Sequence, residues 1–257
     1  MFMINPIAFH IGSLEIRWYG IIFALAFLIG IFMAARLAKK RNISADTIYD
    51  FSIWLILGSV IGARIGHVFF YNWSYYIKHL NEIISIWNGG VSLYGGILGA
   101  VIVALIYCKI KKMEFYDLGD IFVIPLAFGT IFGRIGNFIN QELYGKITTL
   151  PWGVKFDNAV GIRHPTQIYE SIGNLIVFLI LIFMWRKNVK KGTIFWSYLS
   201  IYSLIRFLAE FLREDKIIAI GLTLTQLIIV PIFIVSLFFL YKINKKQKNE
   251  IQKTNIA

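Results

Sequence analysis

The chain has few charged residues and few of the motifs that build common catalytic sites. Only 16% of its 257 residues are charged, whereas soluble globular domains contain about 25%, so a soluble globular protein is excluded. Its single cysteine, Cys108, excludes an internal disulfide bond. The sequence has no His-Glu-x-x-His zinc motif, no Gly-x-Ser-x-Gly nucleophile elbow and no phosphate-binding P-loop, which excludes the enzyme classes that these motifs define.

Hydrophobic residues, by contrast, make up 58% of the chain and gather in long runs. A helix needs about 20 apolar residues to cross the roughly 30 Å of hydrocarbon in a bilayer, and several runs approach this length. We therefore predict an all-α membrane protein with seven transmembrane helices in a single domain. The predicted spans are residues 18–37, 50–71, 91–107, 117–132, 165–185, 193–212 and 222–240.

Glycines recur at four-residue spacing in three of the predicted spans. Small residues at this spacing let two helices approach closely, so we expect these glycines to be packing positions. They are Gly58, Gly62 and Gly66, then Gly95 and Gly99, then Gly129 and Gly133.

Basic residues account for the net charge of +12 and decide the predicted orientation. Every basic cluster follows an odd-numbered span, and loops rich in lysine and arginine stay on the cytoplasmic side. The N-terminus is therefore predicted outside, the basic tail 242–257 inside, and a small loop region between spans four and five at the outer face. This placement explains the charge without nucleic acid as a partner. The clusters are Lys39, Lys40 and Arg41; Lys109, Lys111 and Lys112; Arg186, Lys187, Lys190 and Lys191; and Lys242, Lys245, Lys246, Lys248 and Lys253.

Four polar residues lie at the predicted outer end of span four: Arg134, Asn137, Asn140 and Glu142. Charged residues beside hydrocarbon are costly and usually functional. The planar guanidinium of Arg134 offers several donors to a phosphate group. The alternative is an arginine that extends to the interface and only ends the helix.

Span six has a polar stripe on one face. Tyr202, Arg206, Glu210 and Arg213 are spaced by four, four and three residues, which places them on the same side of a helix. Glu210 offsets part of the cost of burying Arg206, so this pair is either structural or part of a site.

Span five begins with the polar run from His164 to Glu170. Pro165 suits the first turn of a helix, whose free N–H groups favour anions, and Gln167 and Glu170 are three residues apart on that turn. Capping of the helix would explain these residues equally well. Their predicted place on the same outer side as Arg134 favours a functional site.

Several motifs together resemble those of the bacterial prolipoprotein diacylglyceryl transferases. The run Gly133–Gly145 is similar to the family pattern Gly-Arg-x-Gly-Asn-Phe-x-Asn-x-Glu-x-x-Gly, and all seven fixed positions after the first glycine are present. The resemblance extends along nearly the whole chain. Its other segments are Arg17–Gly20, Gly89–Gly96, His164–Glu170 and the stripe from Tyr202 to Arg213.

This resemblance implies transfer of the diacylglyceryl group of phosphatidylglycerol to the lipobox cysteine of a preprolipoprotein. A thioether would form and glycerol phosphate would leave. The implied partners are phosphatidylglycerol, lipobox signal peptides and membrane lipid, with no metal and no cofactor. The implied location is the bacterial cytoplasmic (inner) membrane, with a multi-pass chain and the active site toward the outer face.

The resemblance also implies roles for individual residues. Arg134 and Arg206 would bind the phosphate and stabilise charge on the leaving group. Tyr19 and Glu210 would orient these arginines. The other implied substrate-binding residues are Asn137, Asn140, Glu142, Gly145 and Tyr202.

The chain departs from the family at Tyr94, where many members have a histidine that is a candidate base for the substrate thiol. A phenol has a reference pKa of about 10 and a thiol about 8.5. Tyr94 would therefore act as the catalytic base only if nearby arginines lower its pKa, and otherwise it would position lipid. Alternatively, the field of Arg134 and Arg206 lowers the pKa of the substrate thiol directly.

A transporter is the main alternative from another functional class. In that case Arg206 and Glu210, together with Arg64 and Asp120, would line a path for a small solute or ion. Asp120 lies deeper than Arg134, and we expect it to be a structural partner of a buried base.

Overall fold

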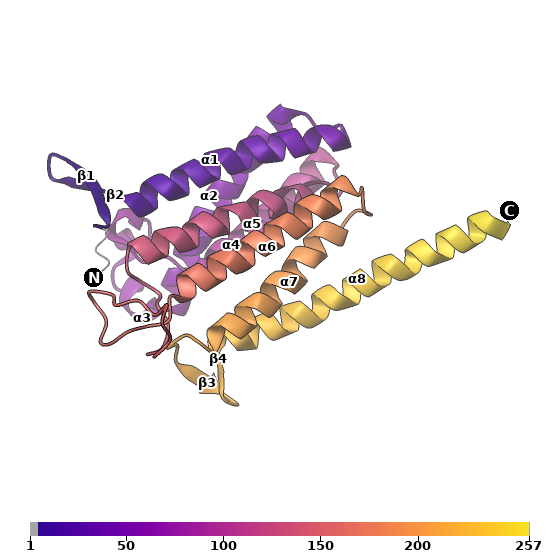
Figure 1. Cartoon of the computed structure of the whole chain (residues 1–257). Coiled ribbons are helices and arrows are strands. Elements are labelled where there is room, and N and C mark those ends of the chain that lie inside the picture. Colours follow the sequence, from indigo (N-terminus) through magenta and orange to yellow (C-terminus); the bar gives the residue numbers. More distant parts are fainter. Residues whose placement is uncertain (1–4, 257) are drawn as a thin grey trace. The chain divides into compact units, whose positions relative to one another are not determined.

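The computed structural model describes residues 5–256, with side chains described as far as Lys245, so Lys246, Lys248 and Lys253 lie outside the described side chains. Seven long helices make up most of this part of the chain (Figure 1). They are α1 (Trp18–Ala38), α2 (Ala45–Phe70), α4 (Leu93–Lys111), α5 (Phe115–Ile139), α6 (Thr166–Arg186), α7 (Thr193–Glu210) and α8 (Leu224–Ile256).

Two short hairpins interrupt the helical pattern, and the sequence analysis did not predict them. The first pairs β1 (Ile7–Ile11) with β2 (Leu14–Arg17), directly before α1. The second pairs β3 (Ile217–Ala219) with β4 (Leu222–Thr223), directly before α8. Each hairpin therefore leads the chain into a long apolar helix.

Six of the long helices are long and apolar enough to cross a bilayer, and the chain is accordingly a multi-pass helical membrane protein. The remaining long helix, α7, is less apolar because serines, tyrosines, Arg206 and Glu210 interrupt it. The predicted positions agree with the helices to within several residues. The main differences are that α5 continues to Ile139, beyond Arg134 and Asn137, and that α8 continues into the predicted basic tail.

The chain forms two compact units, and the boundaries between them fall within α1 and α5. The unit from Ala35 to Leu118 is built on the packing of α2 against α4. A Cβ added to Gly62 would lie 2.5 Å from the carbonyl oxygen of Gly95, and one added to Gly66 would lie 2.7 Å from the Gly95 Cα. The expected close approach is thus confirmed for the glycines of these two helices.

Arg64 of α2 organises the segment that joins α2 to α4, which contains α3 (Trp73–Tyr76). The residue is only 5% exposed, and its guanidinium donates to four backbone carbonyls at 2.6–3.0 Å. A guanidinium that is occupied in this way serves as a structural clamp. The carbonyls belong to Glu82, Ile83, Gly89 and Gly90.

The other unit contains the chain up to Ala34 and the chain from Gly119 onward. In this unit α1 meets α5 where a Cβ on Gly30 would lie 3.3 Å from the Pro125 Cβ. Asp120 accepts hydrogen bonds from the backbone N–H groups of Gly192 and Phe195, both at 2.8 Å, and so caps the N-terminus of α7. Asp120 therefore has a structural role, as expected, with the α7 backbone as a partner, and its pairing with a buried base stays a prediction.

Gly129 and Gly133 differ from the other glycines at four-residue spacing. Among the described residues, and apart from the neighbouring backbone of α5 itself, no heavy atom lies within 4 Å of a Cβ built on either of them. The expectation that they mediate close helix contacts is not met, because spacing along one helix does not determine what faces it.

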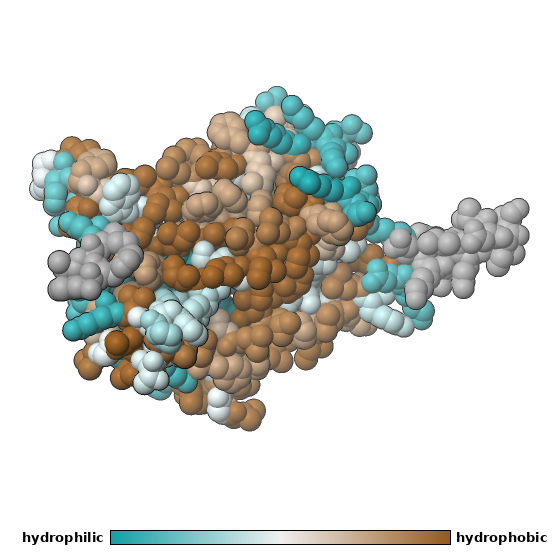
Figure 2. All heavy atoms as spheres, in the orientation of Figure 1, coloured by the Kyte–Doolittle hydropathy of each residue, from teal (hydrophilic) through white to brown (hydrophobic). Residues whose placement is uncertain are grey.

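Apolar side chains cover much of the helix surface in Figure 2, and hydrophilic side chains gather near the ends of helices. On α1 the exposed residues include Phe23, Leu28 and Phe32, which are 51%, 52% and 59% exposed. In water this surface would be unfavourable, whereas lipid tails solvate it. The pattern agrees with helices that contact lipid.

Candidate functional site

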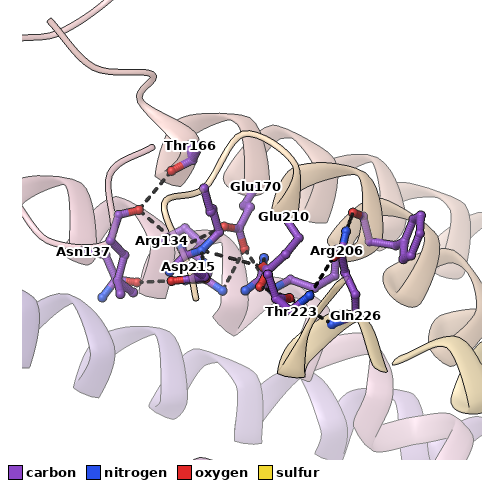
Figure 3. Close-up of polar contacts among 12 residues, drawn as sticks. Arg134, Asn137, Thr166, Glu170, Arg206, Glu210, Asp215, Thr223 and Gln226 are labelled. Carbon is purple, nitrogen blue, oxygen red and sulfur yellow. Dashed lines mark hydrogen bonds and ion pairs between the residues drawn. The ribbon is translucent and has the colours of Figure 1, made fainter. Parts of the chain in front are cut away.

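Three arginines, one from α5 and two from the end of α7 and the chain just after it, converge on one buried carboxylate, that of Glu170. Figure 3 labels Glu170 with two of them, Arg134 and Arg206. Arg134 of α5 places its Nη2 2.7 Å from Glu170 Oε2. Arg206 of α7 lies 3.8 Å from the same oxygen through Nε, and Arg213, just after α7, lies 3.5 Å from Oε1 through Nη1. Glu170 is 2% exposed, so it joins α5, α6 and the end of α7 as a buried ionic hub.

The polar stripe of α7 forms the second half of this cluster. Arg206 Nη1 lies 2.5 Å from Glu210 Oε2, an i,i+4 pair, and Arg213 Nε lies 3.8 Å from the same carboxylate oxygen. The side chains of Arg206 and Glu210 are 10% and 0% exposed. The predicted pairing of these two residues is therefore present, and it is part of a larger network.

Residues after α7 complete the network. Thr223 of β4 donates its hydroxyl to Glu210 Oε1 at 2.6 Å, and Gln226 accepts from the Thr223 backbone N–H at 3.1 Å. Arg213 Nε pairs with Asp215 Oδ2 at 2.8 Å. Burial alone would raise the pKa of Asp215. The hydrogen bond from Arg213 and its positive charge outweigh burial, so the pKa of Asp215 lies below its usual range.

The charges of this cluster balance. Arg134, Arg206 and Arg213 contribute three positive charges, and Glu170, Glu210 and Asp215 contribute three negative charges. Arg134 is the most accessible of the arginines, with a side chain 19% exposed against 10% for Arg206 and 7% for Arg213. An incoming anion can therefore reach Arg134 most directly.

A sharp turn follows α5 and brings Glu142 back toward the helix. Asn137 Nδ2 donates to Glu142 Oε1 at 2.8 Å, and Asn140 Nδ2 lies 3.5 Å from the same oxygen. Gln141 and Leu143 have φ of +57° and +59°, a conformation that is unfavourable for residues other than glycine. Such backbone strain is concentrated at functional sites.

Backbone carbonyls of this turn are bound by the segments beside it. Gln167 donates to the Glu142 carbonyl at 2.6 Å, and Thr166 donates to the Leu143 carbonyl at 2.9 Å. Arg213 Nη1 also donates to the Leu143 carbonyl, at 3.3 Å. The polar first turn of α6 therefore both holds the strained turn and supplies Glu170.

Gly145 lies where the loop after α5 passes the chain after α7. A Cβ at this position would lie 2.5 Å from the Leu212 carbonyl oxygen and 2.6 Å from Thr166 Cγ2. The Gly145 N–H donates to the His164 carbonyl at 2.9 Å. Close packing of the backbone therefore requires glycine here, which places Gly145 in the framework around the polar residues.

The tyrosines predicted for the site occupy different places. Tyr19 packs against α5, since a Cβ on Gly136 would lie 2.6 Å from its ring. Tyr202 stacks on Tyr198 with ring centroids 5.6 Å apart, one turn before Arg206. Tyr94 belongs to the other unit, in the first turn of α4, where it is 37% exposed.

The residues that the transporter alternative requires are engaged in structural contacts. Arg64 clamps four backbone carbonyls, and Asp120 caps α7. Arg64 belongs to the unit from Ala35 to Leu118, whereas Asp120 belongs to the unit that contains Arg206 and Glu210, where its carboxylate is occupied by the backbone of α7. The structure therefore does not support the transporter.

Six residues predicted for the site from the sequence lie in one unit of the structure: Arg134, Asn137, Asn140, Glu142, Arg206 and Glu210. Four further members of the network had no role predicted from the sequence: Glu170, Thr223, Gln226 and Asp215. Of these, Glu170 lies within the polar run that begins span five. Thr223 and Gln226 gave no signal, because they are common residues at the start of an apolar helix.

Comparison with known proteins gives a consistent result over nearly the full chain. Residues 6–242 match the family model described as prolipoprotein diacylglyceryl transferase. Proteins named phosphatidylglycerol–prolipoprotein diacylglyceryl transferase are similar to the chain. That of Finegoldia magna is 41% identical, covering 94% of this chain and 97% of its own. That of Geobacter sulfurreducens is 36% identical, covering 95% and 97%. That of Streptococcus pyogenes serotype M5 is 38% identical, covering 96% and 97%. The chain therefore belongs to the prolipoprotein diacylglyceryl transferase family.

Proposed function

We propose that this protein transfers the diacylglyceryl group of phosphatidylglycerol to the lipobox cysteine thiol of preprolipoproteins, the first step of bacterial lipoprotein maturation. The observation that carries the proposal is the convergence of Arg134, Arg206 and Arg213 on Glu170, with Arg134 the most accessible of the three. Membership of the family and the names of its relatives support the choice of both substrates.

In the proposed reaction the cysteine sulfur attacks the glyceryl carbon that bears the phosphate. The carbon–sulfur bond of the thioether forms as the carbon–oxygen bond to phosphate breaks. Glycerol phosphate leaves with the bonding electron pair and gains one negative charge, and the thiol proton is released. The protein must therefore stabilise charge that develops on the phosphate oxygens.

Arg134 and Arg206 are proposed to supply this stabilisation. Arg134 uses Nη2 for Glu170 and approaches Asn137 with Nη1 at 3.5 Å, and the guanidinium has five N–H donors in total. Because three carboxylates balance the three arginines, we propose that stabilisation comes from directed hydrogen bonds more than from a net positive field. Glu210 and Tyr19 are proposed to orient the two arginines.

Asn137, Asn140 and Glu142 are proposed to bind the lipid head group, with Gly145 keeping the surrounding backbone close. Tyr202 is proposed to complete the site from α7. Tyr94 is proposed to position the lipid rather than to remove the thiol proton, because a neutral phenol hydroxyl is a weak proton acceptor.

We further propose that the chain is a single integral-membrane transferase domain in the bacterial cytoplasmic (inner) membrane. Seven spans would place the N-terminus outside and the C-terminus inside, with α7 as the span that its polar stripe makes less apolar. The arginine cluster would then lie toward the outer face. The basic clusters at the C-terminal ends of α1, α4 and α6 and in the C-terminal part of α8 support this orientation.

The direct test is a reaction with purified components. Protein in phosphatidylglycerol nanodiscs is incubated with a synthetic lipobox peptide, and the peptide is analysed by mass spectrometry. We expect the mass of one diacylglyceryl group to be added at the cysteine, and no addition to a peptide with serine at that position. An unmodified cysteine peptide, with folded protein and lipid present, would contradict the proposed function.

A further inference from the structure

The β3–β4 hairpin exposes a set of isoleucines that a water-facing loop would not favour. Ile217, Ile218 and Ile220 are 63%, 54% and 92% exposed, and they lie within four consecutive residues. Figure 2 shows hydrophobic side chains on the protrusion that Figure 1 labels β3 and β4. The tip therefore presents apolar surface away from the protein.

The turn at the tip has unusual residue chemistry. Ile220 and Gly221 have φ of +53° and +73°. Asparagine, aspartate or glycine is favoured at the first of these positions, whereas a β-branched residue is strained there. In water, Ile220 would thus be unfavourable both for its backbone conformation and for the exposure of its apolar side chain. Contact with an apolar phase would remove the cost of that exposure.

The chain on both sides of the hairpin indicates which apolar phase is present. β4 leads directly into α8, where Leu224 is 48% exposed and exposed apolar residues resume at Ile232, so the hairpin and this helix both present apolar side chains outward. Lys216 precedes the isoleucines, and a lysine beside apolar side chains suits a surface that contains anionic lipid. Exposed apolar side chains must be shielded from water at all times, also when no substrate is bound. The membrane provides such permanent cover, whereas a peptide substrate that binds transiently does not.

The base of the hairpin is joined to the arginine cluster. Thr223 donates to Glu210 at 2.6 Å, and Glu210 in turn pairs with Arg206. Asp215, just before the hairpin, pairs with Arg213 at 2.8 Å. The hairpin and the arginine cluster are therefore fixed to each other at both ends of the hairpin.

We propose that the β3–β4 hairpin is immersed in the membrane interface, with Ile218 and Ile220 in contact with lipid. The hairpin then forms a lipid-embedded rim of the arginine cluster and holds it near the level of the lipid head groups. This inference depends on the membrane character of the chain and not on the reaction that it catalyses.

Site-directed spin labelling tests the proposal on the whole chain. Cys108 is the only cysteine and is buried, so Cys108→Ser provides a background without thiols. Nitroxide is attached at Ile220→Cys and, as a control, at Asn158→Cys in the exposed loop between α5 and α6. In nanodiscs containing phosphatidylglycerol, collisions with oxygen and with a polar nickel complex are measured by electron paramagnetic resonance.

We expect the label at position 220 to collide several-fold more with oxygen than with the nickel complex, and the label at 158 to show the reverse. Equal behaviour at the two positions would overturn the proposal. The proposal would also be overturned if the label at position 220 became protected from the nickel complex only after addition of a lipobox peptide, because the peptide and not lipid would then cover the hairpin.

The direction in which a substitution at Ile220 changes Tm provides a second test. Asparagine tolerates the left-handed conformation better than isoleucine, so Ile220→Asn should raise Tm if the tip lies in water. If the tip lies in lipid, the polar amide loses apolar contacts and Tm in nanodiscs should fall. A Tm that rises or stays unchanged would count against membrane immersion.

Discussion

Glu170 is the residue on which the charge balance of the site depends. Its carboxylate is nearly inaccessible to solvent and contacts three guanidinium groups. Removing one member of a buried ionic network leaves the others uncompensated, which is strongly unfavourable. The residue therefore has a structural role that the arginines of the cluster require.

Glu170→Gln should consequently destabilise the protein, by about 3–5 kcal/mol, because the amide cannot compensate three arginines. The matched control is Glu15→Gln, which removes the partner of Arg17 from a pair whose side chains are 45% and 56% exposed. Exposed pairs contribute at most about 1 kcal/mol. Thermal unfolding in nanodiscs measures the stability of both variants. Equal Tm values for the two variants would contradict the role of Glu170 as the hub.

Arg134→Lys should nearly abolish turnover while the protein remains folded. Lysine keeps the positive charge but loses the planar set of donors that binds Glu170 and that we propose also binds a phosphate. The comparison is Arg186→Lys at the end of α6, which is exposed and outside the cluster and should react normally. Product formation with the lipobox peptide is the measurement, and a near-normal rate for Arg134→Lys would show that Arg134 only supports the structure.

Tyr94→Phe should retain measurable activity in the same assay. The ring that we propose to contact lipid remains, and the phenol is a weak proton acceptor at neutral pH. Complete loss of activity in a correctly folded Tyr94→Phe protein would instead assign the hydroxyl an essential part in removing the thiol proton.

At the scale of helices, glycine spacing has two different outcomes in this chain. Gly62 of α2 packs against the backbone of α4, whereas Gly129 of α5 has open space around the position of a Cβ. The same sequence pattern thus describes a helix contact in one case and an open helix face in the other.

Gly62→Ala and Gly129→Ala should therefore differ in stability. The alanine methyl at position 62 would lie 2.5 Å from the Gly95 carbonyl oxygen, so α2 and α4 must move apart and lose contacts. At position 129 the methyl meets no heavy atom within 4 Å, and alanine is the better helix former. We expect a clear decrease of Tm for Gly62→Ala and an unchanged or higher Tm for Gly129→Ala.

At the scale of the whole molecule, orientation in the membrane is the main untested prediction. A membrane-impermeant maleimide should label Asn158→Cys in intact cells, in the Cys108→Ser background, because the loop after α5 is predicted outside. Asn188→Cys, between α6 and α7 and beside Lys187, should react only after the cells are opened. The opposite pattern would reverse the proposed topology.

Hydropathy predicted the helices well because lipid exposure imposes length and apolar composition on each of them separately. It did not predict the β3–β4 hairpin, because residues 217–220 fell in the short connection between the predicted spans 193–212 and 222–240 and are too few to show a strand pattern. The continuation of α5 past Arg134 was uncertain for a related reason: polar residues suggest an end, whereas the backbone remains helical to Ile139.

The polar motifs identified most of the site, but not its connections. Arg134, Glu170 and Arg213 belong to three distant segments, and their meeting depends on how α5, α6 and the chain after α7 pack. Thr223 and Asp215 act through single hydrogen bonds that have no periodic pattern. Local sequence therefore could not identify them.

The sequence by itself determined the membrane class, the places of the helices and the family, because these depend on local composition and on motifs of fixed spacing. Tertiary structure alone decided that the arginines are balanced by an equal number of carboxylates, with Glu170 as their shared partner. It also decided which glycines are packed and that the hairpin before α8 exposes its isoleucines. The physical reason is that charge compensation, close packing and exposure are relations between distant segments, and they exist only once the helices have packed.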